Sequence, residues 1–297
     1  MKRLLRIGLL LILGSCSSFS SRTGEKPLVF VSIPPQVWFM EQLAGEEFQV
    51  EVMVGPGENP ATYEPRPRQL EKLSRAKAFF AIGVPFEEAW MPRIKELLPR
   101  MKVYDVSAGI PKQPVDDFRT LMGGSPEKEE SHGHGHLDPH IWLSPELGKQ
   151  MAENMAVALA HIDPEGESRY KERLALLLED LTQLQKEVRV ILGQGEKAPF
   201  AVFHPSWGYF CREFGLEQIP IEVRGKEPAP RELQAILDYL KERGVKTVMI
   251  QKEFSRHAAV RIAEALNGEV VTLDPLGSDY PALLKEAARA AAGKAGE

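Results

Sequence analysis

Short apolar runs alternate along this chain with longer stretches in which apolar residues recur every three or four positions. The runs predict buried strands, and the longer stretches predict amphipathic helices. In the first half, strands are predicted at 28–32, 48–53, 78–82 and 102–106, and helices at 35–44, 68–75 and 87–98. In the second half, strands are predicted at 200–203, 218–223, 247–250 and 270–273, and helices at 208–214, 229–243, 255–266 and from Tyr280 onward. This alternation indicates parallel sheets covered by helices on both faces.

The segment Glu167–Leu192 lies between these two regions, contains no Gly or Pro, and repeats apolar residues at helical spacing. It predicts a single helix of about 26 residues, which would be about 39 Å long. We therefore expect an α/β protein with two lobes, each a parallel sheet flanked by helices, joined by one long rigid helix. The expected division is a first lobe at 27–160, the linking helix within 161–195, and a second lobe at 196–297.

The N-terminus has the pattern of an exported protein. Basic residues precede an apolar run at 7–13, which is too short to span a membrane, so residues 1–15 are interpreted as a signal peptide. The small residues before Cys16 resemble the lipobox of bacterial lipoproteins, in which that cysteine becomes the first mature residue and carries the lipid. Residues 16–26 would then be a lipidated tether. The alternative is an ordinary signal peptide with an incidental cysteine. We expect an exported protein that is lipid-anchored at the cell surface or in the periplasm.

The charge balance narrows the choice of partners. The chain has 37 basic and 42 acidic residues, and removal of a basic signal peptide would make the remainder more acidic still. An acidic surface argues against nucleic acid as a partner. With only Cys16 and Cys211 present, no intramolecular disulfide is expected. We expect a monomer that is stabilised by core burial.

The segment Ser131–Pro145 concentrates histidines, with four of the seven within nine residues: His132, His134, His136 and His140. Neutral imidazole is a common zinc ligand, and alternating glycines make the first three side chains adaptable. His140 differs from them because Pro139 restricts the backbone before it and the apolar residues 141–143 follow. Metal binding is therefore the first hypothesis for this segment, and a polar surface loop is the alternative.

Two further candidate ligands follow predicted strands. His204 comes directly after the strand at 200–203, and Asp274 directly after the strand at 270–273. In open α/β sheets, ligands bind outside the carboxyl ends of the strands, and a cleft between two lobes can receive donors from both. Taken singly, a histidine at a strand end is more often structural, and an aspartate before a proline is usually a turn residue.

The chain resembles the metal-binding lipoproteins of bacterial zinc and manganese ABC importers over nearly its whole mature length. The resemblance depends on the order and spacing of five segments: Ser32–Pro35, Asn59–Pro65, Asp138–Pro145, Glu227–Pro228 and Leu273–Gly277. It implies an extracytoplasmic protein that captures a divalent transition metal and delivers it to an ABC transporter permease, without catalysis. A histidine-rich loop is typical of the zinc-specific members, and this chain has a short one, so Zn²⁺ is favoured, with Mn²⁺ or another divalent metal left open.

The resemblance also implies a ligand set. Three family ligands correspond to His140, His204 and Asp274, but the fourth position is Ala61, which has no donor. The implied site is thus His₂Asp with an open position. Water, Glu58 on the same loop, or a histidine of the flexible run (His132, His134 or His136) could fill it.

Two other functions remain as alternatives. An open His₂Asp site is also the arrangement of catalytic zinc, so a zinc-dependent hydrolase is one of them. It would need a general base, for which Glu58 is the only candidate, and the sequence has no HExxH-type helix. The other is a degenerate paralogue that has lost tight metal binding and acts as an adhesin, a metallochaperone or a carrier of another ligand.

Overall fold

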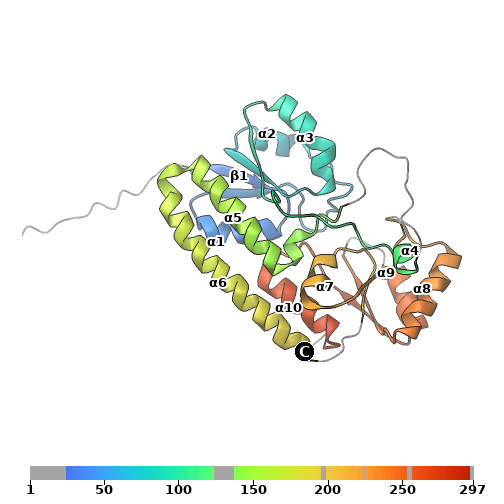
Figure 1. The fold of residues 1–297 in the computed structure, drawn as a ribbon. Coiled ribbons are helices and arrows are strands. Elements are labelled where there is room, and N and C mark those ends of the chain that lie inside the picture. Colours follow the sequence, from blue (N-terminus) through green and yellow to red (C-terminus); the bar gives the residue numbers. More distant parts are fainter. Residues whose placement is uncertain (1–24, 124–136, 195–198, 224, 253–255, 295–297) are drawn as a thin grey trace, which may run out of the picture.

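Two parallel sheets of the same topology form the framework. The computed structural model describes residues 25–123, 137–194, 199–223, 225–252 and 256–294 (Figure 1). The first sheet has the order β2-β1-β3-β4, and its strands are β1 (Leu28–Val31), β2 (Gln49–Val52), β3 (Ala78–Ala81) and β4 (Lys102–Asp105). The second has the order β6-β5-β7-β8, with β5 (Phe200–Val202), β6 (Gln218–Pro220), β7 (Thr247–Ile250) and β8 (Glu269–Thr272). The predicted α/β class with two parallel sheets is confirmed.

Helices connect the strands at the predicted places, and two helices that were not predicted are present as well. The first half contains α1 (Pro35–Ala44), α2 (Pro67–Leu73), α3 (Pro85–Leu97) and the two unpredicted helices, α4 (Phe118–Leu121) and α5 (Pro145–Ile162). The second contains α6 (Glu167–Leu192), α7 (Gly208–Phe214), α8 (Pro230–Glu242), α9 (Arg256–Ala265) and α10 (Tyr280–Ala291). Several of these helices begin with proline, whose restricted φ fits the first helical position and whose missing N–H is not needed there. This explains why α2 and α3 begin one or two residues before their predicted starts.

The long linking helix is present as predicted. Helix α6 has 26 residues and buries the apolar face formed by Leu177, Leu181, Leu184 and Val188. Helix α5, which the sequence patterns did not predict, packs along it in the antiparallel direction, because only the short turn at 164–166 separates the two. The side chain of Ser144 caps α5 by accepting a hydrogen bond from Leu147 N at 3.1 Å.

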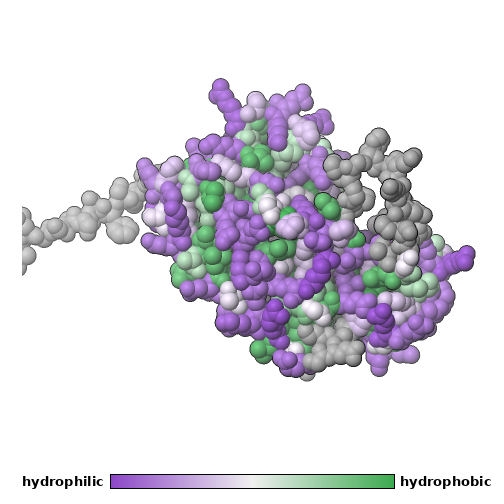
Figure 2. All heavy atoms as spheres, viewed as in Figure 1, coloured by the Kyte–Doolittle hydropathy of each residue, from purple (hydrophilic) through white to green (hydrophobic). Residues whose placement is uncertain are grey.

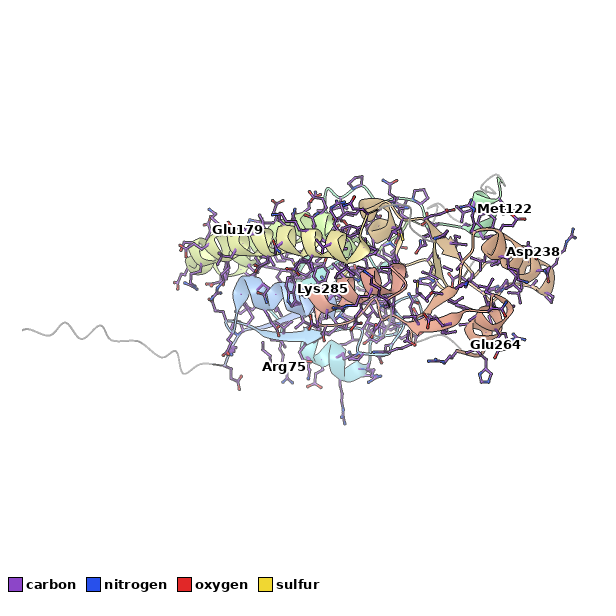
Figure 3. All side chains as sticks on the ribbon, turned by 90° about the horizontal axis from the view of Figure 1, so that it is seen from below. Arg75, Met122, Glu179, Asp238, Glu264 and Lys285 are labelled. Carbon is purple, nitrogen blue, oxygen red and sulfur yellow. The ribbon has the colours of Figure 1, made fainter. Side chains whose placement is uncertain are left out.

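The C-terminal helix joins the core of the first half. Tyr280 of α10 stacks on Trp38 with ring centroids 5.1 Å apart and meets the edge of Phe39 at 4.8 Å. Figure 3 shows α10, labelled at Lys285, and α6, labelled at Glu179, side by side. The larger hydrophobic core therefore includes residues of the first sheet, α5, α6 and α10, while a smaller core lies around the second sheet.

A second connection between the halves follows β4. The chain leaves the first sheet, and Phe118 of α4 enters the smaller core, where its ring meets Tyr239 of α8 at 5.5 Å. The chain returns through a β-bridge between Pro114 and Leu137, which leads directly to Asp138 and the residues after it. This crossing places the segment that contains His140 between the two halves (Figure 1).

Hydrophilic side chains predominate on the face shown in Figure 2, and the apolar residues there are scattered. Within the described ranges, no helix combines the length and the apolar character needed to cross a membrane. The signal peptide and Cys16, the predicted lipidation site, lie outside the described residues.

Candidate metal centre

The surroundings of His140 hold its ring, as the sequence predicted. A 3₁₀ turn at Ile141–Leu143 follows His140 directly, and its three side chains are buried. The indole Nε1 of Trp142 donates a hydrogen bond to the carbonyl oxygen of Pro275 at 2.8 Å. This bond fixes the His140 segment beside the segment that contains Asp274.

His204 lies just beyond β5, a central strand of the second sheet. Its ring centroid is 5.5 Å from that of His140, and the ring planes are inclined by 72°. The side chains of His140 and His204 keep 15% and 29% of their exposure, respectively. The structure thus brings two of the predicted ligands together from separate parts of the chain and leaves both accessible to a small ion.

Each histidine is paired with a buried carboxylate. The Nδ1 atom of His140 lies 2.7 Å from Asp138 Oδ1, and the Nδ1 atom of His204 lies 2.7 Å from Glu222 Oε1. A carboxylate oxygen accepts, so Nδ1 carries the proton and the lone pair of each ring is on Nε2. Metal-ligating histidines have this pairing, in which the carboxylate fixes both the tautomer and the direction of the ring.

Sequence reasoning missed the roles of Asp138 and Glu222. Asp138 lies in the same short segment as His140, so the signal was local. Glu222 is 18 positions from His204, and only the sheet order explains their contact: β6 pairs with β5, so the residues after both strands meet. Glu222 N also donates to the Phe203 carbonyl oxygen at 3.0 Å, which continues the pairing of the strands.

Asp274 has other partners in this structure. Its Oδ2 atom lies 3.0 Å from Lys252 Nζ, and its Oδ1 atom accepts a hydrogen bond from Leu276 N at 2.9 Å. Within the described part of the chain, no three His, Cys, Asp or Glu side chains are gathered closely enough to hold a metal ion. The assignment of Asp274 as a third ligand therefore stays a prediction.

The loop that contains Ala61 binds its own polar groups. Ala61 is exposed, and its N–H donates to Asn59 Oδ1 at 2.8 Å. The Glu58 carboxylate accepts from Gly55 N at 2.8 Å and forms an ion pair with Arg66. The Glu58 carboxylate is thus engaged within its own loop. This residue is the one that the sequence offers both as a candidate fourth ligand and as the candidate base of a hydrolase. The other proposed fourth ligands, His132, His134 and His136, lie outside the described residues.

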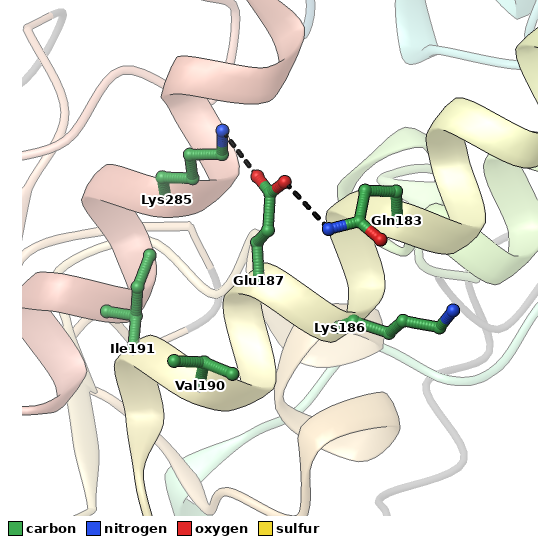
Figure 4. A pocket seen from close by; sticks show the side chains of 6 residues that line it. All are labelled: Gln183, Lys186, Glu187, Val190, Ile191 and Lys285. Atoms are coloured by element: carbon green, nitrogen blue, oxygen red, sulfur yellow. Dashed lines mark hydrogen bonds and ion pairs between the residues drawn. The ribbon is translucent and has the colours of Figure 1, made fainter.

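A hollow of about 330 Å³ opens elsewhere on the surface, between α6 and α10. Figure 4 shows its lining residues: Gln183, Lys186, Glu187, Val190, Ile191 and Lys285. An ion pair of 2.6 Å between Glu187 and Lys285 joins the two helices across it. This hollow has no histidine or cysteine in its lining and is separate from the histidine pair.

Cys211 is not a competing metal or nucleophile site. It lies in α7 and is buried, and burial raises the pKa of its thiol well above the ordinary value. Because the thiolate is the form that binds metals and attacks substrates, a buried neutral thiol has a structural role.

Comparison with known proteins shows the family of this chain. The family described as zinc-uptake complex component A, periplasmic (ZnuA), matches residues 29–292. A putative metal-binding protein of Chlamydia muridarum (strain MoPn / Nigg) is 30% identical over 275 residues, which cover 91% of this chain and 94% of that protein. The high-affinity zinc uptake system protein ZnuA of Bacillus subtilis (strain 168) is 26% identical over 282 residues, covering 90% and 85%.

A crystal structure of ZnuA matches this fold with a TM-score of 0.81 at 38% sequence identity, and the match covers 91% of this chain and 99% of that one. The resemblance found in the sequence motifs is confirmed over the whole region that contains both sheets and the histidine pair. The chain belongs to the ZnuA family of periplasmic zinc-uptake components.

Proposed function

We propose that this protein is an extracytoplasmic solute-binding protein that captures a zinc ion and delivers it to the permease of an ABC transporter. The observation that carries the proposal is the pair of neighbouring histidines, each with its Nδ1 atom on a buried carboxylate. Membership of the ZnuA family supports the same function.

The spacing of the two rings fits a shared ion. A zinc ion bonded to Nε2 at about 2.0–2.1 Å lies about 3.2 Å from the ring centroid, so two histidines at a tetrahedral angle have centroids about 5.2 Å apart. The centroids of His140 and His204 are 5.5 Å apart. The spacing of the two rings is therefore compatible with one shared ion.

Two histidines leave two positions of a tetrahedral zinc site for other ligands. Asp274 would be the third ligand once it exchanges Lys252 for the metal, and water, Glu58 or a histidine of the 132–136 run would complete the site. Two imidazoles favour Zn²⁺ over Mn²⁺, which prefers carboxylate and water ligands. Release to the permease would need only a small movement between the halves, because α6 and the shared core limit a larger one.

The proposed location is outside the cytoplasm, with the protein lipid-anchored at the cell surface or in the periplasm. The family is periplasmic, and the segment before the fold has the pattern of a signal peptide followed by a lipobox cysteine. Acylation of Cys16 would tether a monomeric binding domain near the permease, through the short polar segment 16–26.

Zinc titration of variants tests the proposed site. His140→Ala and His204→Ala should each weaken zinc binding at least about tenfold, or about 1.4 kcal/mol, because each removes one imidazole ligand. The dissociation constant is measured by competition with a chelator. His257→Ala is the matched control, since this histidine is exposed on α9, and it should leave the constant unchanged. An unchanged dissociation constant for His204→Ala would show that the site is misassigned.

A further inference from the structure

Asp138 is a buried carboxylate whose two oxygens have different surroundings. Its side chain has no exposure. The Oδ1 atom accepts from the ring Nδ1 of His140 at 2.7 Å and from the backbone N of His140 at 2.9 Å. The Oδ2 atom is buried and has no hydrogen-bond partner among the described residues. A buried carboxylate in this situation needs a nearby positive charge, since its desolvation is costly.

Arg212 of α7 supplies that charge. Its Nη2 atom lies 3.6 Å from Asp138 Oδ2, and its Nη1 atom donates to Asp116 Oδ1 at 3.2 Å. The guanidinium also lies over the Tyr209 ring, 5.0 Å from its centroid. Asp116 is held in turn by Gln218, whose Nε2 donates to Oδ2 at 2.6 Å. Arg212 is therefore fixed between two carboxylates and a ring.

Tyr209, on the same helix, holds the backbone of the Asp138 segment. Burial raises the pKa of its phenol, so the hydroxyl stays protonated and donates to the Asp138 carbonyl oxygen at 2.9 Å. The hydroxyl oxygen accepts from Gln113 N at 2.9 Å, and Asp138 N donates to the Gln113 carbonyl oxygen at 2.7 Å. Because α7 begins four residues after His204, the same short helix is linked to both metal-site histidines.

Gly208 leaves room for Arg212 to lie beside Asp138 and Asp116. A Cβ atom at this position would lie 2.9 Å from both Arg212 Nη2 and Asp138 Oδ2, and 3.2 Å from Asp116 Oδ2. Any larger residue would have to push the arginine and the two carboxylates apart. The first residue of α7 is thus small at the point where the three charged groups meet.

We infer that Arg212 is a positioning residue for metal capture. Its charge stabilises the Asp138 carboxylate, and this carboxylate holds the Nδ1–H of His140 so that Nε2 faces the metal. The role of Arg212 in zinc binding rests on the proposed function. The effect of Arg212 on the His140 ring is independent of any metal.

The metal-free protein gives the first test. Long-range ¹⁵N NMR spectra at pH 8 should show His140 as the Nδ1–H tautomer in the natural protein and as a mixture of tautomers in Arg212→Met. Arg212→Lys should restore part of the preference because it keeps the charge, and Gly208→Ala should disturb it without removing any charge. The matched control is Arg243→Met, since Arg243 lies over Tyr239 at 4.7 Å and pairs with Glu217, away from Asp138. An unchanged His140 tautomer in Arg212→Met overturns the inference.

Zinc affinity gives the second test. Arg212→Met should weaken binding about three- to tenfold, less than the roughly 10- to 100-fold typical of a direct carboxylate partner of a ligand. The loss should persist in a His204→Ala background and fall below about twofold in a His140→Ala background, because the arginine acts through His140. An equal loss in both backgrounds would mean a general structural role and would overturn the inference. If His140→Ala itself leaves zinc binding intact, the proposed function fails, whereas the tautomer test still decides the role of Arg212.

Discussion

His140 and His204 make the same contact in two different ways. Each has its Nδ1 atom 2.7 Å from a buried carboxylate, but Asp138 precedes His140 by two residues, whereas Glu222 follows β6, the strand that pairs with β5 before His204. His204 and Glu222 both lie just beyond paired strands of the second sheet. His140 and Asp138 lie on the segment that returns from the second half, and α7 holds them there through Tyr209 and Arg212. The contact of His204 is thus formed beside one sheet, whereas the contact of His140 depends on the docking of the two halves.

This difference indicates how an ion could be released. A movement of the crossing segment relative to α7 would break the contacts that hold Asp138 and His140 and leave the His204–Glu222 contact in place. One ligand would then turn away while the other kept its geometry, and the shared core would limit the size of the change.

The largest expected effect comes from the two carboxylates. Asp138→Asn and Glu222→Gln should each weaken zinc binding about 10- to 100-fold, because each removes the charge that orients a ligand histidine. Since the two contacts have the same length, the losses should agree within about threefold. Glu217→Gln is the control, because Glu217 pairs with Arg243 away from the histidines. A silent Glu222→Gln would show that the two pairs are not equivalent, and the comparison would fail.

A histidine introduced at position 61 should tighten zinc binding instead of weakening it. Both histidines come from segments outside the loop at 58–66, where the resemblance in the sequence motifs implies a ligand histidine at the position of Ala61. Ala61→His should tighten zinc binding by about 1–3 kcal/mol if the loop backbone already places the side chain near the ion. Ala61→Ser, which adds no imidazole, is the control.

Deletion of 131–136 separates the candidates for the open position. A loop histidine that fills it would make the deletion costly in the natural protein and nearly silent in the Ala61→His variant. No gain from Ala61→His together with no loss from the deletion would contradict the open-coordination account, and Glu58→Ala would then be measured.

The smallest expected effect concerns Lys252. Its side chain is 61% exposed, so its ion pair with Asp274 is weak, and the pair must break when Asp274 binds the metal. Lys252→Met should therefore tighten zinc binding about two- to fivefold. The control is Lys246→Met, at an exposed lysine just before β7. Titration should show a change for Lys252→Met alone. If the two variants bind zinc equally well, Asp274 is not a ligand.

Some features could be predicted from the sequence because their signals are local. Strand and helix alternation predicted both sheets, and the uninterrupted apolar repeat of 167–192 predicted α6. The sequence predicted His140 as a candidate ligand from the restricted residues around it, and His204 from its position after a strand together with the family resemblance. Helix α5 was not predicted; the face that it buries consists mainly of alanine, glycine and methionine, and large branched apolar residues are few.

The rest depends on contacts between distant residues. Glu222 becomes a partner of His204 only through the pairing of β5 with β6. Arg212 reaches Asp138 only because the crossing segment docks on α7, and the packing of α10 against Trp38 requires the chain to return to the first half. No pattern within one segment contains this information, since each contact depends on how the elements are arranged in space.

The most direct test of the account is a crystal structure of the zinc-loaded protein with anomalous data at the zinc edge. The account predicts one zinc peak between the halves, about 2.0–2.1 Å from Nε2 of both His140 and His204, with Asp138 and Glu222 still on the Nδ1 atoms. A zinc ion bound through Nδ1 of either ring, or located away from this histidine pair, would contradict it.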